Sequence, residues 1–560
     1  MSGFKIILED RFHYLAAIGA GLLLALAFPK FSVAGFAWVA PGILLFSAIG
    51  GRTVFRIGAA GGLACYLASL YWLLYIPVTF LPILGWLALS AYLACFTGFW
   101  VWFSWRISPA RLSELKWKAG IDLFFERSTW LQRTRWALEC AVLWVALEMF
   151  MGRFLSGFPW DFLGVSQYRM IPIIQVAEYT GVYGVSFLLI WFSVSLAMAG
   201  AALLKGSNQR RTWAKEIALP LLLTTILAVQ GWNKLRAAER PGDTVQVALI
   251  QPSIPQTLIW DEGENANRFQ QLLHLSEQAL TNQPDILIWP EASVPNMLRH
   301  DQETADAVID LAKRYHAWII LGSDDAERRP GTTSMRDIDY FNSAFAVSPE
   351  GVLSGRYQKR RLVIFGEYVP FVKWLPFLKM LSPAGESGFT PGARPVPFHL
   401  GELGVIASVL ICFEDTFPHI AREYVREDTD FLVNLTNNGW FGESAAQWQH
   451  AATAVFRAVE NRIALVRCAN NGLTCWVDAR GVLHETYFPD STDVYKAGYK
   501  LANVPILAKG QKRDLTFYTR FGDVFGWTCC GVTALLMAAE WQGARKRRSK
   551  AGPHNDCQNS

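Results

Sequence analysis

Apolar residues are crowded into two parts of this chain, and this crowding limits the folds that the chain can adopt. Before about residue 232 the sequence is a succession of long apolar runs, and one more run follows residue 521. A helix of roughly 20 apolar residues is long enough to cross a bilayer. We therefore predict a polytopic helical membrane domain, in keeping with a composition that is 52% hydrophobic and only 18% charged.

Eight membrane-spanning helices are predicted, seven of them before residue 232. The first run has no small-residue cleavage site and other spans follow it at once, so we expect it to be retained and not removed as a signal peptide. The approximate spans are residues 14–28, 35–49, 54–76, 83–105, 136–151, 182–204, 217–231 and 524–539.

The distribution of Lys and Arg predicts how these spans are oriented. Basic residues concentrate around residues 52–56, 106–135 and 205–215 and in the tail after residue 545. Since cytoplasmic loops carry such an excess, we expect both termini to be cytoplasmic and the polar region after the seventh span to lie outside the cytoplasm. The predicted parts are a membrane domain (1–232), an outer domain (243–507), an eighth span (521–541) and a basic tail (542–560).

Charge and spacing exclude several function classes. The net charge of +5 is modest for 560 residues, so no nucleic-acid partner is expected. The nine histidines are scattered without HxH or HExxH spacing, so we expect neither a metal nor another cofactor. Cys468 and Cys475 flank a turn and could form a disulfide outside the cytoplasm, although two separate core thiols are the simpler interpretation.

The outer domain alternates short apolar strands with amphipathic helices, which predicts an α/β fold. Ranges 343–347 and 352–357 flank the turn signal SPEG and are interpreted as a hairpin. The predicted strands are residues 245–250, 286–289, 317–321, 343–347, 352–357, 405–411 and 431–435, and the predicted helices are residues 267–280, 305–315 and 445–461.

The stretch VIASVLICFED, residues 405–415, carries a single cysteine from a buried strand into a turn flanked by carboxylates. Cys412 by itself would be interpreted as a small core residue, because free cysteines are usually buried and inert. Two other stretches favour catalysis: DILIWPEA ends a strand near Glu291, and YQKRRLVIFGEYVP carries Lys359 and Glu367. Taken alone, this Glu and Lys would be solvated surface residues. Their shared position at strand ends is where a rigid sheet commonly presents functional groups.

Glutamate, lysine and cysteine together form a chemically complete set. A nearby ammonium favours the thiolate, and a carboxylate can accept the thiol proton and later return it to a leaving group. The lysine can also stabilise the oxyanion of a tetrahedral intermediate. The set therefore predicts acyl transfer through a thioester, provided that the three residues converge in space.

These stretches resemble the Glu-Lys-Cys motifs of the nitrilase, or carbon-nitrogen hydrolase, superfamily. With the membrane spans around the domain and the segments GFPW (157–160), GVYGVSF (181–187), QPSIPQ (251–256) and NNGWFG (437–442), the chain resembles one branch, the apolipoprotein N-acyltransferases. The resemblance runs from the first span to the eighth. It implies a nitrilase-like αββα sandwich for the outer domain.

The resemblance also implies roles for individual residues. Glu291 would be the general base and acid, Lys359 the oxyanion-stabilising ammonium and Cys412 the nucleophile, with Glu367 supporting the lysine. Phe413 and Glu414 would line the nucleophile turn, and Trp260 and Trp440 would contact substrate. Trp374 and Phe377 belong to the apolar segment 369–381 and are expected to contact substrate as part of a lid. The chain departs from the family in having Ile364 where a proline is common and Phe413 where a tyrosine is common. In both cases the replacement is an apolar side chain, so we expect the chemistry to be unchanged.

The reaction implied by the resemblance is ping-pong. The cysteine takes an acyl chain from a phospholipid, typically phosphatidylethanolamine, and passes it to the α-amino group of the diacylglyceryl-cysteine at the N-terminus of an apolipoprotein. The implied location is the inner membrane of a diderm bacterium, with the catalytic domain in the periplasm. No oligomer is implied.

Two other function classes remain open from the residues alone. A membrane-anchored amidase acting on a small amide would use the same triad, and a transporter or receptor would have no need of it. The apolar segment VPFVKWLPFLKML, residues 369–381, favours the lipid enzyme, because we interpret it as a membrane-facing lid that guides acyl chains. The alternative is that this segment packs against helices of its own domain.

Overall fold

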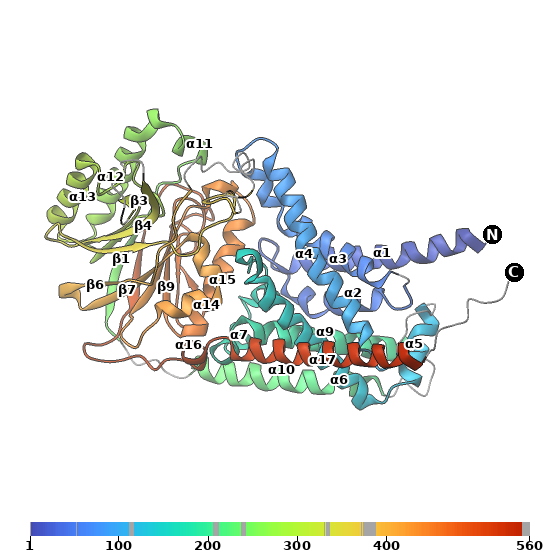
Figure 1. Cartoon of the computed structure of the whole chain (residues 1–560). Helices are drawn as coiled ribbons and strands as arrows, with labels where there is room; N and C mark the ends of the chain where they lie inside the picture. Colours follow the sequence, from blue (N-terminus) through green and yellow to red (C-terminus); the bar gives the residue numbers. More distant parts are fainter. Residues whose placement is uncertain are drawn as a thin grey trace.

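The computed structural model describes residues 2–51, 53–110, 117–204, 212–236, 242–329, 331, 337–370, 372, 374 and 388–550. It consists of a bundle of long helices and an α/β domain built on two sheets (Figure 1). The α/β domain lies in the chain between α10 (Trp213–Arg236) and α17 (Val524–Lys550), so helices of the bundle precede and follow it. The α/β class predicted for the outer region is confirmed.

Four helices in the described part of the chain are long and apolar enough to cross a membrane: Leu81–Arg106, Val182–Leu204, Trp213–Arg236 and Val524–Arg547. Two shorter apolar helices, Arg11–Ala27 and Val54–Ser69, accompany them. The helices of the bundle are α1 (Ser2–Ala27), α2 (Ala40–Ser47), α3 (Val54–Ser69), α4 (Leu81–Arg106), α5 (Trp117–Glu126), α6 (Trp130–Met151), α7 (Ile171–Ile174), α8 (Ala177–Thr180), α9 (Val182–Leu204), α10 (Trp213–Arg236) and α17 (Val524–Lys550).

The second predicted span differs most from the structure. Instead of one helix over residues 35–49, the chain forms a 3-10 turn, η1 (Ala34–Trp38), and then α2, which has only 8 residues. Pro41 lies in the first turn of α2, where proline is accepted because that amide has no helical partner. Eight residues rise roughly 12 Å, which is well short of a bilayer core.

The fifth predicted span begins earlier than its apolar run suggests. Helix α6 starts at Trp130, because Thr129 caps it: its side chain accepts from the Gln132 amide, and the Gln132 side chain accepts from the Thr129 amide. This reciprocal capping satisfies two amides that a helix start otherwise leaves unpaired. The capping residues therefore start the helix at Trp130, although polar residues precede the apolar run.

Basic side chains at one end of the bundle pair with acidic side chains of neighbouring helices. At this end Arg106 of α4 pairs with Glu540 of α17 at 3.1 Å, and Arg133 of α6 pairs with the buried Glu216 of α10 at 2.6 Å. Figure 1 shows the first turns of α1 and the last turns of α17 at the end of the bundle away from the α/β domain. Both described ends of the chain are therefore on the side remote from the sheets.

The α/β domain contains two six-stranded mixed sheets, with strand orders β12-β1-β2-β3-β4-β5 and β11-β10-β9-β8-β7-β6. The first sheet comprises β1 (Thr244–Gln251), β2 (Ile286–Ile288), β3 (Trp318–Arg328), β4 (Ile338–Val347), β5 (Leu353–Gln358) and β12 (Gly498–Pro505). The second comprises β6 (Pro397–Leu400), β7 (Val405–Ile411), β8 (Phe431–Thr436), β9 (Ala464–Ala469), β10 (Cys475–Val477) and β11 (Leu483–His484).

Helices cover the outer faces of both sheets. Figure 1 shows α12 (Asn265–Leu280) and α13 (Gln302–Tyr315) beside the first sheet, and α15 (Ala446–Asn461) between the second sheet and the bundle. Along β1, residues such as Val247 and Leu249 pack toward the second sheet, whereas Ala248 and Ile250 pack under the helices. This alternation is what a sheet covered on both faces requires. The remaining domain helices are α11 (Gln256–Ile259), α14 (Pro418–Ala421) and α16 (Phe517–Phe521).

One buried side chain of α15 joins the domain to the bundle. The Gln449 amide nitrogen donates to the carbonyl oxygens of Pro29 at 2.9 Å and Ser69 at 3.0 Å. Its carbonyl oxygen accepts from the indole nitrogens of Trp72 and Trp160, each at 2.8 Å. Four segments distant in sequence thus meet at one amide that is 2% exposed.

We predict that Gln449→Leu destabilises the whole protein. The substitution leaves two indole donors and two carbonyl acceptors buried without partners, and each such group costs about 1–3 kcal/mol. Thermal unfolding in detergent, followed by tryptophan fluorescence, should show Tm lowered by about 5 °C or more. Gln278→Leu on the exposed face of α12 is the matched control and should leave Tm unchanged; equal Tm values for the two variants would contradict the role of Gln449.

Candidate active site

The three predicted catalytic residues come from both sheets. Glu291 follows β2 and Lys359 follows β5 in the first sheet, whereas Cys412 follows β7 in the second. The Lys359 ammonium lies 3.1 Å from Glu291 Oε1. Charges on Glu291 and Lys359 both act on the Cys412 thiol, so the structure brings the three groups together.

Glu291 is held at a fixed position by groups from three other segments. Its Oε1 accepts from the Asn342 side-chain amide at 2.8 Å and from Lys359, and its Oε2 accepts from the backbone amide of Asn437 at 2.9 Å. The residue is only 8% exposed. Because protein groups supply these hydrogen bonds, the Glu291 carboxylate keeps its orientation without the help of bound water.

Lys359 bridges two carboxylates. Its ammonium lies 2.9 Å from Glu367 Oε1 as well as 3.1 Å from Glu291 Oε1, and the residue is 1% exposed. Burial alone lowers the pKa of Lys359, but the charges of Glu291 and Glu367 outweigh burial and hold this pKa well above its ordinary value. The lysine is therefore a permanent positive charge at the site.

Cys412 occupies a strained turn. Its φ is +50°, a left-handed conformation that costs free energy for residues other than glycine. Its carbonyl oxygen accepts from the Asn434 side chain at 3.0 Å and lies 3.2 Å from His450 Nε2, while Thr436 donates its hydroxyl to the sulfur at 3.3 Å. These contacts hold the thiol at the end of β7.

The Cys412 thiol is protonated at neutral pH. Burial raises its pKa most, the negative charge of Glu291 raises it further, and Lys359 opposes them, with a resulting pKa of about 12. The sequence suggested that a nearby ammonium would favour the thiolate; in the structure burial and Glu291 outweigh it. A reaction at this sulfur would require a group that accepts the thiol proton, and among the charged neighbours Glu291 has the largest effect on the pKa of the thiol.

Glu414 connects the cysteine turn to the lysine loop. Its Oε1 accepts from the backbone amides of Arg360 at 2.7 Å and Arg361 at 3.0 Å, and its Oε2 accepts from the Ile411 amide at 2.7 Å. The Tyr357 hydroxyl lies 2.8 Å from both oxygens. With 0% exposure, Glu414 cannot meet substrate and acts by positioning the two strand ends.

Several polar residues that the sequence motifs did not reveal organise the site. Asn342 of β4 donates to both Glu291 and Glu367 at 2.8 Å, yet nothing in its local sequence marks it. His450 Nε2 lies 2.7 Å from Asp415, which in turn accepts from Arg467 at 3.0 Å. The position of Asp415 directly after the cysteine turn is a signal that could have found this second network.

Asp324 of β3 is a further carboxyl group near the triad. It lies directly opposite Asn342 in the antiparallel register of β3 and β4, so the two side chains share a face of the sheet. Burial raises its pKa most, and the charges of Glu291 and Glu367 raise it further, to about 7. No motif in the sequence identifies this residue.

Aromatic residues continue from the site into the helical bundle. Phe413 stacks on Trp160 with ring centroids 6.1 Å apart, and Trp160 lies 5.3 Å from the His450 ring. On another side Trp260, 44% exposed, meets Trp440 edge to face at 5.2 Å. That Trp260 and Trp440 contact substrate stays a prediction.

The predicted lid is only partly described. Trp374 is 83% exposed, whereas Phe377 and most of residues 369–381 lie outside the described residues. Whether this segment guides acyl chains stays a prediction. Cys468 and Cys475 are both free, buried thiols, as the simpler interpretation proposed. Within the described ranges, no group of three or more His, Cys, Asp and Glu side chains could hold a metal ion.

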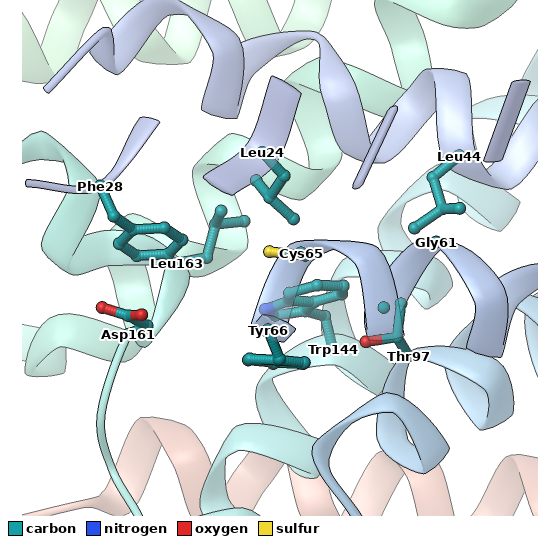
Figure 2. Close-up of a pocket in the computed structure, with 11 residues that line it drawn as sticks. Leu24, Phe28, Leu44, Gly61, Cys65, Tyr66, Thr97, Trp144, Asp161 and Leu163 are labelled. Atoms are coloured by element: carbon teal, nitrogen blue, oxygen red, sulfur yellow. The ribbon is translucent and has the colours of Figure 1, made fainter. Parts of the chain in front are cut away.

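A separate cavity lies inside the helical bundle, lined mainly by apolar side chains and glycines. In Figure 2, Asp161 and Phe28 lie at one side of the lining, and Leu44, Gly61 and Thr97 lie at the other. Asp161 Oδ2 is buried without a hydrogen-bond partner among the described residues. The catalytic residues do not line this cavity, so it is distinct from the thiol site.

Both parts of the chain match known families. Residues 20–195 match the apolipoprotein N-acyltransferase N-terminal domain, and residues 246–501 match the carbon-nitrogen hydrolase family. Among solved structures, an amidase from Nesterenkonia sp. is similar at 17% identity over 48% of this chain and 92% of that chain, with a TM-score of 0.34.

Curated relatives match nearly the full length. An apolipoprotein N-acyltransferase from Geobacter metallireducens is 35% identical over 537 residues, covering 94% of this chain and 95% of that protein. One from Vibrio vulnificus is 28% identical over 551 residues, covering 96% of this chain and 98% of that protein. The chain therefore belongs to the apolipoprotein N-acyltransferase family.

Proposed function

We propose how this chain carries out the N-acylation of lipoproteins, the activity of its family. Cys412 is the nucleophile, Glu291 the general base and acid, and Lys359 the stabiliser of the oxyanion. The observation that carries the proposal is the Lys359 ammonium held between two carboxylates beside a half-buried, protonated thiol. Such a site can receive a proton from sulfur and stabilise developing negative charge on oxygen.

In the first half-reaction the Cys412 sulfur attacks the ester carbonyl of a phospholipid, and its proton passes to Glu291. The carbonyl oxygen becomes an oxyanion, which Lys359 stabilises. The ester C–O bond then breaks, the glycerol oxygen takes the proton from Glu291, and a lysophospholipid leaves. The acyl chain remains on sulfur as a thioester.

In the second half-reaction the acceptor replaces the lysophospholipid. The α-amino group of the diacylglyceryl-cysteine attacks the thioester and gives its proton to Glu291. When the C–S bond breaks, the thiolate recovers that proton and the N-acylated lipoprotein leaves. Glu367 and Asn342 act as positioning residues, because each holds Lys359 or Glu291 in place.

A phospholipid donor is supported by the arrangement of the two domains. The nucleophile turn stacks through Phe413 on Trp160, which belongs to the connection between α6 and α9 in the bundle. Helix α15 of the catalytic domain packs on the same connection through Gln449. The nucleophile turn thus contacts the bundle, beside which a lipid ester is available, and we place substrate contacts at Trp260, Trp374, Phe377 and Trp440.

We also propose that the catalytic domain is periplasmic and that both termini are cytoplasmic, in the inner membrane of a diderm bacterium. In this arrangement eight segments cross the membrane, and the second of them, η1 with α2, is shorter than a bilayer core is thick. Support comes from Arg106 and Arg133, which lie at the bundle end remote from the sheets, since an excess of Lys and Arg marks the cytoplasmic side.

A thioester on Cys412 is the expected product of the first half-reaction. Wild-type protein incubated in detergent with phosphatidylethanolamine and no acceptor should gain the mass of one acyl chain, and hydroxylamine should remove it. Cys412→Ala and Glu291→Ala should show no such adduct, because the first lacks the nucleophile and the second lacks its base. Intact-protein mass spectrometry is the measurement.

A different outcome would favour the anchored amidase. If the wild type gains no adduct, leaves phospholipid unchanged and hydrolyses a small amide, the lipid mechanism is wrong. Lys313→Ala on the exposed side of α13 is the surface control, and this variant should acquire the adduct at the wild-type rate.

The charges around the thiol should control its reactivity in opposite directions. Glu291→Gln removes a negative charge that raises the Cys412 pKa, whereas Lys359→Met removes a positive charge that lowers it. At pH 9 to 10, iodoacetamide should therefore alkylate Cys412 faster in Glu291→Gln and more slowly in Lys359→Met than in the wild type, by about tenfold for each unit of pKa change. Both variants should lose acyl transfer. Alkylation rates that change the other way would contradict the assigned geometry.

Accessible cysteines should report the orientation of the chain in the membrane. Glu350 lies exposed in the turn between β4 and β5, and Arg135 lies exposed near the start of α6. In cells with a permeabilised outer membrane, a membrane-impermeant maleimide should label Glu350→Cys above the wild-type background. It should label Arg135→Cys only after the inner membrane is opened, and the reverse pattern would invert the proposed orientation.

A further inference from the structure

A group of positively charged residues and one histidine lies beside the catalytic site, where the α/β domain meets the bundle. We define this basic patch as Arg153, Arg361, His419 and Arg422. Arg153 follows the end of α6, Arg361 follows the catalytic lysine by two positions, and the other two lie at and after α14. None of these residues has a role in the acyl-transfer steps described above.

Arg361 is held close to the nucleophile turn. Its backbone amide donates to Glu414 at 3.0 Å, and its guanidinium lies over the ring of Phe417 at 4.9 Å. The Phe417 ring meets Phe413, the neighbour of Cys412, at 5.0 Å. One aromatic layer therefore separates this guanidinium from the residue that follows the nucleophile.

The Arg361 guanidinium has no carboxylate partner in the described part of the chain. Its Nε is buried and makes no hydrogen bond there. By contrast, the adjacent Arg360 pairs with Glu423 at 2.9 Å, and Arg153 pairs with Asp523. A half-buried guanidinium without an anion loses hydration that nothing in the described protein replaces.

The surroundings of Arg361 add positive charge and another unused polar atom. Arg422 donates to the Thr519 carbonyl at 2.8 Å and likewise pairs with no carboxylate among the described residues. His419 Nδ1 is buried without a partner within the same ranges. Burial and then the charges of Arg153, Arg361, Arg457 and Arg422 lower the pKa of His419 to about 3, so the imidazole is neutral.

An interfacial aromatic residue lies beside the patch. Arg153 packs over the ring of Trp527 in the first turn of α17 at 5.2 Å, and tryptophan is enriched at that level of a bilayer. Ser156, just beyond Arg153, lies within hydrogen-bond distance of Tyr368 at 2.6 Å. The loop that follows the catalytic lysine is therefore tied to the bundle beside the patch.

We propose that Arg361, with Arg153, Arg422 and His419 around it, binds the phosphate of the phospholipid acyl donor. The proposal rests on the proposed phospholipid mechanism. In a glycerophospholipid the phosphate and the reacting ester share one glycerol, so an ester at Cys412 brings the phosphate to the adjoining turn. A guanidinium fork matches two phosphate oxygens, and it would gain in the complex the anion that it lacks in the free protein.

The test compares two acyl donors on the same variants, with no acceptor present. One donor is phosphatidylethanolamine in mixed micelles, and the other is p-nitrophenyl palmitate, which carries no phosphate. Arg361→Gln should lower kcat/KM for thioester formation from the phospholipid by about 10- to 100-fold and leave the rate from the phosphate-free ester within about twofold. Arg360→Gln, whose guanidinium already has a carboxylate, is the matched control and should change neither rate.

Several results would overturn the proposal. Equal losses with both donors would mean that Arg361 only maintains the turn through Glu414, and unchanged phospholipid kinetics would mean that it binds no phosphate. If Arg361→Gln fails to fold, Arg361→Lys is measured instead, because it keeps the positive charge and loses the guanidinium fork. A lower rate of thioester formation from the phospholipid alone supports the phosphate site, and an equal decrease with both donors contradicts it. Failure of the wild type to react with phospholipid, despite acylation by the palmitate ester, would instead reject the proposed donor.

Adding inorganic phosphate shows whether the patch binds the phosphate group of the donor or a free phosphate ion. If the patch binds the phosphate of the donor in preference to the free ion, millimolar phosphate should leave acylation by the palmitate ester unchanged and inhibit acylation by phospholipid weakly and competitively. Strong inhibition with both donors would show a free-anion site that blocks the thiol, and this result would contradict the assignment to the lipid.

Discussion

The buried carboxylate of Glu414 is the interaction on which the catalytic geometry depends. It joins the cysteine turn of one sheet to the lysine loop of the other through backbone amides and the hydroxyl of Tyr357. Burying a carboxylate is costly unless donors surround it, and here they come from both strand ends. The two sheets thus cannot separate or slide at this point without exposing an unpaired charge.

The membrane part meets this geometry at α15. The buried amide of Gln449 contacts segments from the bundle, and the following residue, His450, contacts the carbonyl oxygen of Cys412. Successive residues of one helix therefore connect the bundle and the nucleophile turn. The nucleophile turn is therefore fixed relative to the bundle as well as relative to its own sheet.

Periodicity and motif predicted much of the molecule, because those signals are local. Helix α9 has the predicted bounds, and the strand that delivers Cys412 was recognised from its apolar run alone. The structure of the second span is harder to predict, because a 3-10 turn and Pro41 divide it. Asn342 could not be predicted, because its role depends on which strands pair and which faces meet, and the pKa of Cys412 depends on burial that no spacing reveals.

The pairing of β1 with β12 has a consequence for biosynthesis. Thr244 opposes Pro505 across this antiparallel pair, so the strand that begins the domain is completed by the strand that ends it. The nascent chain must hold β1 with one edge unpaired until synthesis has passed Pro505. During that interval the exposed edge is open to pairing with other chains, so the first sheet stays prone to mispairing until the last strand of the domain has been made.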